Sequence, residues 1–195
     1  MESTSGSLMH RVATQSGDLD LERKLEAVRQ TPAEILFVST ADTELSALAR
    51  VWGPKFGGRL RLMTAGALQH PAAAEHYADH VLMHSKLAIF RLHGGRGYFP
   101  HLLDEIQHIK SHGAQVRVLV LPGTDQWDAE LLSYGDYAEP LALRLFDYFR
   151  EGGLTNYELA AQAVERLLEN QADGFPEPVT VPTFGWYEPW KQTTD

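Results

Sequence analysis

Cysteine is absent from this chain of 195 residues. Without a thiol, the protein can form no disulfide bond, no thiolate nucleophile and no cysteine-based metal site. Long apolar runs are also missing, because no stretch approaches the roughly 20 apolar residues that span a bilayer. Residues 1–8 are too polar for the apolar core of a signal peptide. These absences predict a cytoplasmic protein without a membrane partner.

Positive charge is scarce as well. Lysine and arginine number 17 against 26 aspartates and glutamates, which gives a formal net charge of -9. An acidic surface repels nucleic-acid phosphates and anionic lipid headgroups. The charge balance therefore argues against a nucleic-acid partner and, again, against a membrane.

What is present is a regular alternation of apolar runs and helical patterns. Apolar residues make up 44% of the chain, enough for one substantial core. Strands are predicted at residues 35–38, 59–63, 87–92 and 116–121, and the second of these, which alternates basic and apolar residues, is expected at a sheet edge. Helical spacing follows the first three strands. The pattern predicts an α/β fold with an open, mostly parallel sheet, flavodoxin-like or Rossmann-like.

Local signals set the expected helix ends and the division of the chain. Asp42 is a candidate N-cap, and Gly53-Pro54 is expected to end the helix that follows it. Further helices are predicted at residues 73–83, 100–112, 141–151 and 156–168. We expect a leader at residues 1–33, with a possible strand at 11–13 and a short helix. We expect an α/β module at 34–125, a helical extension packed on it at 126–170, and an extended tail or linker rich in proline and aromatic residues at 171–195.

Ligands of open parallel sheets bind beyond the carboxyl ends of the strands, so the loops there supply the candidate residues. The loop from Arg91 to Tyr98 is the most suggestive, because its glycines would let backbone N–H groups approach an anion and its arginines could clasp carboxylates. The alternative is a purely structural role. The glycines would then only form a tight turn, and the arginines would form surface ion pairs. Asp42 and His70 would be helix caps, and Asp125 would be a turn residue. The candidate substrate-binding residues are Asp42, His70, Arg91, Gly94, Gly95, Arg96, Tyr98 and Asp125.

Histidines recur at helical spacing in two groups. Pairs four residues apart on a helix can chelate zinc or cobalt. Neither group forms an HExxH motif, however, and both lie on the polar sides of their helices. We therefore expect solvated histidines, no metal site and no cofactor bound by this chain, and no catalytic residue is assigned. The groups are His76, His80 and His84, and His101, Glu105, His108 and His112.

Five short segments in order carry a resemblance to a known family. They are Ser39-Thr40-Ala41-Asp42-Thr43-Glu44-Leu45, Leu68-Gln69-His70-Pro71, Arg91-Leu92-His93-Gly94-Gly95 with Tyr98, Leu121-Pro122-Gly123-Thr124-Asp125, and Tyr148 with Gly152-Gly153 and Asn156. In this order the segments resemble the N-terminal region of cobaltochelatase large subunits of the CobN type. His93 and Thr124 depart from the pattern, which has leucine and aspartate there.

The resemblance implies a role in the ATP-dependent insertion of cobalt into hydrogenobyrinic acid a,c-diamide during cobalamin synthesis. In such complexes the large subunit binds the corrinoid and the cobalt substrate, while two AAA+ motor subunits hydrolyse ATP-Mg. The family's large subunits are several times longer, so this chain is expected to be a fragment or a short relative, inactive by itself. Its partners would be the rest of the large subunit, the motor subunits and the corrinoid, whose ring Tyr98 or Trp127 would contact.

Two other functions stay open at this point. The chain could be a non-catalytic interaction module that docks partner subunits through Trp186, Tyr187 and Trp190. It could also be a stand-alone flavodoxin-like protein that binds a small molecule or a nucleotide. Retained flavin or measurable ATP affinity would favour the latter.

Overall fold

The computed structural model describes residues 16–181. Four parallel strands form one sheet, in the spatial order β2-β1-β3-β4. The strands are β1 (Ile35–Ser39), β2 (Leu60–Thr64), β3 (Leu87–Leu92) and β4 (Arg117–Pro122). The predicted open, parallel α/β fold is therefore confirmed, and the strand order is that of flavodoxin-like proteins. The possible strand at 11–13 and the aromatic residues 184–190 lie outside the described part of the chain.

Both faces of the sheet are apolar, which explains the continuous apolar runs of the sequence. In β1, Ile35 and Phe37 contribute to one core cluster, and Leu36 and Val38 contribute to the other. The strands are in register, with Ile35 beside Leu60 on β2 and Leu87 on β3. A side chain period of two along each strand thus supplies two cores at once.

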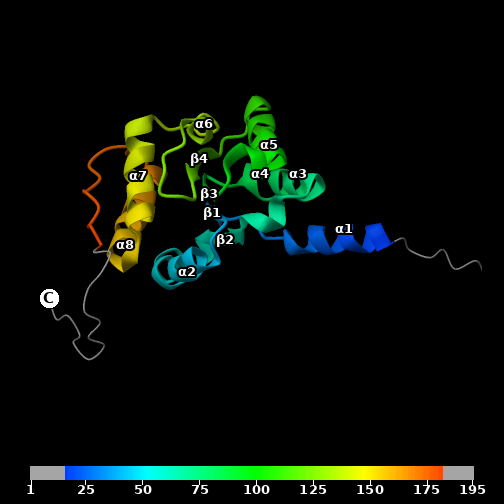
Figure 1. Cartoon of the computed structure of the whole chain (residues 1–195), viewed down its shortest axis with the longest axis horizontal. Helices are drawn as coiled ribbons and strands as arrows, with labels where there is room; N and C mark the ends of the chain where they lie inside the picture. Colours follow the sequence, from blue (N-terminus) through cyan, green and yellow to red (C-terminus); the bar gives the residue numbers. More distant parts are fainter. Residues whose placement is uncertain (1–15, 182–195) are drawn as a thin grey trace, which may run out of the picture.

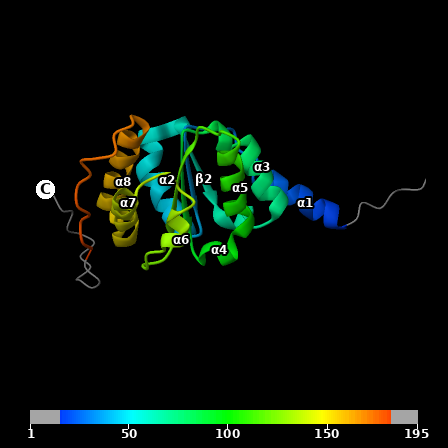
Figure 2. The same cartoon turned by 90° about the horizontal axis from the view of Figure 1, so that it is seen from above.

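Helices cover each face, as Figure 2 shows from above. One layer contains α2 (Asp42–Phe56), α7 (Glu139–Glu151) and α8 (Gly153–Leu168), and the other contains α3 (Pro71–His80) and α5 (Pro100–Ser111). The leading helix α1 (Ser16–Ala27) contacts α3 and extends away from the body (Figure 1). Since crossovers between parallel strands are right-handed, the turn-back between β2 and β3 puts α2 and α3 on opposite faces.

The two edges of the sheet differ in how far other parts of the chain cover them. β2 is an edge strand, as its alternating sequence predicts. At the β4 edge, the chain after the short helix α6 (Ala129–Leu132) pairs with the strand: Asp136 donates its N–H to the carbonyl of Val118 at 2.8 Å, and its carboxylate accepts the N–H of Val118 at 2.7 Å. The β4 edge is therefore partly covered.

Two expectations about α2 are wrong. The N-cap is Ala41, without a side-chain hydrogen bond, and Asp42 is the first helical residue. The helix also runs through Pro54 to Phe56. Proline there removes only one bond of the last turn, and the buried Phe56 ring packs edge-on against Trp52 at 5.7 Å, which holds that turn on the sheet. Gly57, with φ of 52°, ends the helix instead.

The first part of the proline-rich tail runs along α7 and α8 without forming a helix or strand (Figure 1). The Tyr148 hydroxyl donates to the carbonyl of Pro176 at 2.5 Å. The buried Asn156 side chain forms hydrogen bonds to both backbone groups of Val179, at 2.7 and 2.8 Å. Among the helices of residues 16–181, none combines the length and apolarity needed to cross a membrane.

Candidate functional site

The carboxyl ends of β1 and β3 form a topological switch point, because the chain leaves these two neighbouring strands toward opposite faces of the sheet. Thr40, directly after β1, donates its N–H to the carbonyl of Arg91 at 3.1 Å. Its hydroxyl accepts the N–H of His93 at 3.1 Å. Thr40 thereby joins the loops after β1 and β3.

Gly123, directly after β4, closes the same arrangement. Its N–H donates to the carbonyl of Leu92 at 2.9 Å. A Cβ at this position would lie 2.8 Å from the backbone nitrogen of His93 and 3.0 Å from the Thr40 hydroxyl oxygen. Glycine is therefore required by the close approach of three loops.

An open hollow of about 380 Å³ lies at the switch point. Its lining combines hydroxyl, amide and imidazole groups with two aromatic rings, and the Tyr98 side chain is 64% exposed. Such a surface can exchange several hydrogen bonds with a ligand and stack against it. The lining residues are Thr40, Ala41, Thr64, Gly66, Gln69, His93, Tyr98, Phe99 and Gly123.

A second hollow, of about 500 Å³, lies between the glycine-rich loop and the chain after β4, where Trp127 lines it. Gly94 has φ of 87°, and a Cβ there would lie 2.4 Å from the Tyr98 ring. The Tyr98 ring thus lies directly over Gly94. Gly94 lines the second hollow and Tyr98 lines the first, so the two hollows adjoin at this contact. The predicted residues Gly94, Gly95, Arg96 and Tyr98 are therefore together at one edge of the sheet. Asp128, which caps α6 through the N–H of Glu130 at 2.9 Å, brings an acidic group to the same hollow.

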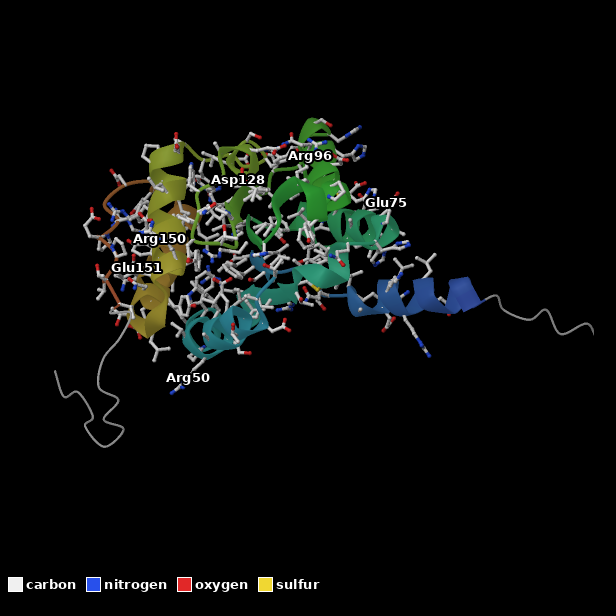
Figure 3. The ribbon with its side chains drawn as sticks, in the orientation of Figure 1. Arg50, Glu75, Arg96, Asp128, Arg150 and Glu151 are labelled. Atoms are coloured by element: carbon white, nitrogen blue, oxygen red, sulfur yellow. The ribbon has the colours of Figure 1, made fainter. Side chains whose placement is uncertain are left out.

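Arg91 and Arg96 do not converge. Arg91, at 6% exposure, points to the α2–α7 face, where its Nε lies 3.2 Å from the Glu44 carboxylate and its guanidinium lies 5.3 Å from the Phe149 ring centre. Burial lowers the pKa of Arg91, and the charge of Glu44 opposes that shift. Arg96 lies on the opposite face, at the top of Figure 3, bound to the Tyr134 hydroxyl and 3.4 Å from Asp104. A two-arginine clasp on one ligand is therefore not formed here.

The remaining predicted residues are spread around this edge. His70 caps α3, since its Nδ1 accepts the N–H of Ala72 at 3.2 Å, and it lines a separate hollow beside α1. Asp42 is exposed on the first turn of α2. Asp125 is exposed in the loop after β4 and raises the pKa of Arg91 from there.

The histidine groups do not form a cluster of three or more metal-binding side chains within residues 16–181. Their members instead stack in pairs one helical turn apart. The rings of His76 and His80 have centroids 4.2 Å apart, and those of His108 and His112 have centroids 4.3 Å apart.

Thr40, Thr64 and Gln69, which line the first hollow, and Glu44, the buried partner of Arg91, were not among the candidate residues named from the sequence, although Thr40 and Gln69 lie in the strand-end loops expected to supply them. A usable signal was available for the two threonines. Each is the last residue of, or the first residue after, an apolar strand run, which places it at the carboxyl edge of the sheet. No comparable signal marks Glu44, because acidic residues in a first helical turn are common.

No protein-family model matches the chain. The chain is 37% identical to the aerobic cobaltochelatase subunit CobN of a Sinorhizobium species over 149 residues, which are 76% of this chain and 12% of that protein. It is 30% identical to the CobN subunit of Pseudomonas aeruginosa over 187 residues, covering 93% of this chain and 14% of that protein.

Among solved structures, the catalytic subunit of cobaltochelatase from Mycobacterium tuberculosis has a similar fold, with a TM-score of 0.57 and 22% identity over 82% of this chain and 12% of that one. The present chain thus spans a small part of the length of each relative. Over most of its own length it is a member of the CobN cobaltochelatase family and corresponds to a partial region of that subunit.

Proposed function

We propose that this region forms part of the corrinoid-binding wall of a cobaltochelatase large subunit, which positions hydrogenobyrinic acid a,c-diamide for cobalt insertion. Cobalt is the metal substrate, and the ATP-Mg that drives the reaction is hydrolysed by AAA+ partner subunits. The observation that carries the proposal is the hollow at the β1–β3 switch point, which combines hydrogen-bonding side chains with the exposed Tyr98 ring.

The lining suits the chemistry of a corrinoid, a flat apolar ring with carboxylate and amide arms. The hydroxyl of Thr64 and the amide of Gln69 can both donate and accept hydrogen bonds, as a primary amide requires. Tyr98 and Phe99 offer aromatic surface to the ring.

Arg96 is the group best placed to bind a substrate carboxylate. Its side chain is 51% exposed and its contact with Asp104 is a surface pair at 3.4 Å. Pairs of this kind contribute at most about 1 kcal/mol, so a ligand carboxylate can replace Asp104. Arg91 is too deeply buried to do the same and would act by holding the loops in place.

The size of the hollow limits what this region can do. At about 380 Å³ it lies near the lower end of the range for small-molecule pockets and is open to solvent. It can hold an edge of the corrinoid, and other parts of the large subunit would cover the rest. The role of this chain is therefore binding and orientation, and cobalt insertion needs the complete complex.

A titration of the purified chain with hydrogenobyrinic acid a,c-diamide tests the proposal, followed by corrinoid absorbance and tryptophan fluorescence. We expect saturable binding that Tyr98→Ala and Arg96→Ala each weaken about tenfold, a loss near 1.4 kcal/mol. Met83→Ala, which removes an exposed apolar side chain from a distant 3-10 turn, is the matched control and should bind as the parent does. Absence of binding, or equal binding by all variants, would contradict the assignment.

A second candidate function is docking of other protein, and one observation favours it. Leu154, Val179 and Val181 are 51%, 49% and 44% exposed. Val181 lies beside Gly153 at the start of α8, so the three residues lie at one corner of the α7–α8 layer. Exposed apolar groups that gather in this way mark contact surfaces. If the chain does not bind the corrinoid but does bind the remaining part of a large subunit, this function replaces the first.

A further inference from the structure

The hollow beside α1 adjoins the hollow at the switch point. Gly66 and Gln69, in the chain just after β2, line both of them. The hollow beside α1 has a volume of about 360 Å³. A ligand that lies over the Tyr98 ring can therefore extend past Gln69 into a second space.

The lining of this second space suits an anion. Lys24 of α1 supplies a positive charge, and His70, just before α3, supplies an imidazole. None of the described residues that line the hollow is acidic. The chain as a whole has a formal net charge of -9. A hollow that carries a cation and no carboxylate is thus an exception on this molecule, and it favours a negatively charged group.

The helix cap made by His70 determines which of its atoms can bind a ligand. Its Nδ1 accepts the N–H of Ala72 at 3.2 Å. The hydrogen of the neutral ring is therefore on Nε2, which acts as a donor. A carboxylate or amide oxygen in the hollow is a suitable acceptor for it. His70 can bind such an oxygen without becoming charged, and the cap of α3 stays intact.

Tertiary contacts at the end of α1 hold Lys24 beside the hollow. Val28, one turn after Lys24, is buried in the apolar cluster that also contains the inner face of α3. Gln30 donates its side-chain N–H to the carbonyl of Leu62 in β2 at 2.9 Å. Lys24 and Ala27 are three residues apart, so they share the face of α1 that lines the hollow. Figures 1 and 2 both show this helix beside α3.

We propose that Lys24 and His70 bind one carboxylate arm of the corrinoid, on the β2 side of the switch point. The inference rests on the proposed function, because the ring must lie at the switch point for an arm to reach this hollow. Arg96 lines the hollow on the β4 side, so groups that bind anions lie on both sides of the ring site. Two such groups fix the orientation of a ring that carries its carboxylates around the rim. Helix α1 is then part of the binding site.

Titrations of the full chain with hydrogenobyrinic acid a,c-diamide, and with the same corrinoid after conversion of its free carboxylates to primary amides, test the inference. We expect Lys24→Gln to weaken binding of the acid about fivefold, as for a solvated ion pair, and to leave binding of the amide form unchanged. Added salt should reduce the effect, because exposed charges are screened. His70→Asn keeps an oxygen that can cap α3 but loses the Nε2 donor, so it should weaken binding of both forms.

Arg23→Gln is the matched control. It makes the same change of charge at the neighbouring, exposed position of α1, which does not line the hollow, and it should bind both forms as the parent does. The inference is wrong, and the proposed function stands, if Tyr98→Ala weakens binding but Lys24→Gln does not. Equal losses in Lys24→Gln and Arg23→Gln would also overturn it. If the parent binds neither form, the proposed function itself fails. Far-ultraviolet circular dichroism checks that His70→Asn retains its helices.

Discussion

At the scale of single residues, the switch point rests on a buried polar network. The Ser39 hydroxyl donates to the Glu44 carboxylate at 2.6 Å and accepts the N–H of Ala41 at 3.0 Å. The other oxygen of Glu44 lies 3.2 Å from Arg91. Both charged side chains are less than a tenth exposed. The network connects the end of β1, the first turn of α2 and the end of β3, so it positions the loops that line the hollow.

Glu44→Ala is expected to lower the free energy of unfolding by about 3–5 kcal/mol, because it leaves the Arg91 guanidinium buried without its counter-charge. Adding Arg91→Met should recover part of this loss, since the second change removes the unpaired charge. Urea denaturation measures both. Glu158→Ala, on the exposed side of α8, is the control and should change stability by no more than about 0.5 kcal/mol. A double variant less stable than Glu44→Ala would contradict this interpretation.

At the scale of elements, the amino ends of three strands meet at one acidic residue. Glu34, just before β1, binds Lys86, just before β3, and Arg59, just before β2. Hydrogen bonds from Lys86 and then Arg59 lower the pKa of Glu34. At the carboxyl ends, the contacts of Thr40 join β1 to β3 and the contact of Gly123 joins β4 to β3. Each end of the sheet is thus tied by polar contacts across neighbouring strands.

The depressed pKa of Glu34 predicts a pH dependence of stability. Because the folded pKa is below the ordinary value of 4.5, the carboxylate stabilises the fold above that pH, and its contribution is lost as the pH falls through the lower folded value. Glu34→Gln should therefore lose less stability on acidification than the parent does. The difference should stay within about 1 kcal/mol, since the pair is solvated. Urea midpoints across the acid range measure it, with Glu130→Gln as an exposed control; a slope unchanged from the parent would refute it.

At the scale of the whole molecule, the helices that follow the sheet in sequence are part of its core. One apolar cluster combines residues of β1, α2, β3 and β4 with residues of α7 and α8. The ring centroids of Phe37 and Phe149 are 5.2 Å apart, and the Trp52 indole N–H donates to the carbonyl of Tyr157 at 2.8 Å. The proposed division into an α/β module at 34–125 and a helical extension at 126–170 therefore crosses a continuous core.

A fragment of residues 34–125 is expected not to fold alone. It would expose the sheet face that α7 and α8 cover, including Phe37, Trp52 and Leu119, and burial of each such side chain contributes about 1.5–3 kcal/mol. A fragment of residues 16–181 should unfold in one cooperative transition. Circular dichroism during urea denaturation distinguishes the two. A cooperative transition in the short fragment would make the helical extension a separate layer instead of part of the core.

The sequence by itself determined the strands, their parallel arrangement and the loops at the carboxyl edge, because apolar runs such as 87–92 are stable only when buried on both faces. It could not place side chains relative to one another. Arg91 and Arg96 are only five residues apart in the chain, yet their side chains lie on opposite faces of the sheet. Arg91 lies two positions after Ile89 in β3 and so shares its face of the sheet, where Glu44 lies, whereas the turn through Gly94 and Gly95 carries Arg96 toward Tyr134. Which groups meet depends on contacts between residues far apart in the chain, and only the tertiary structure decides those.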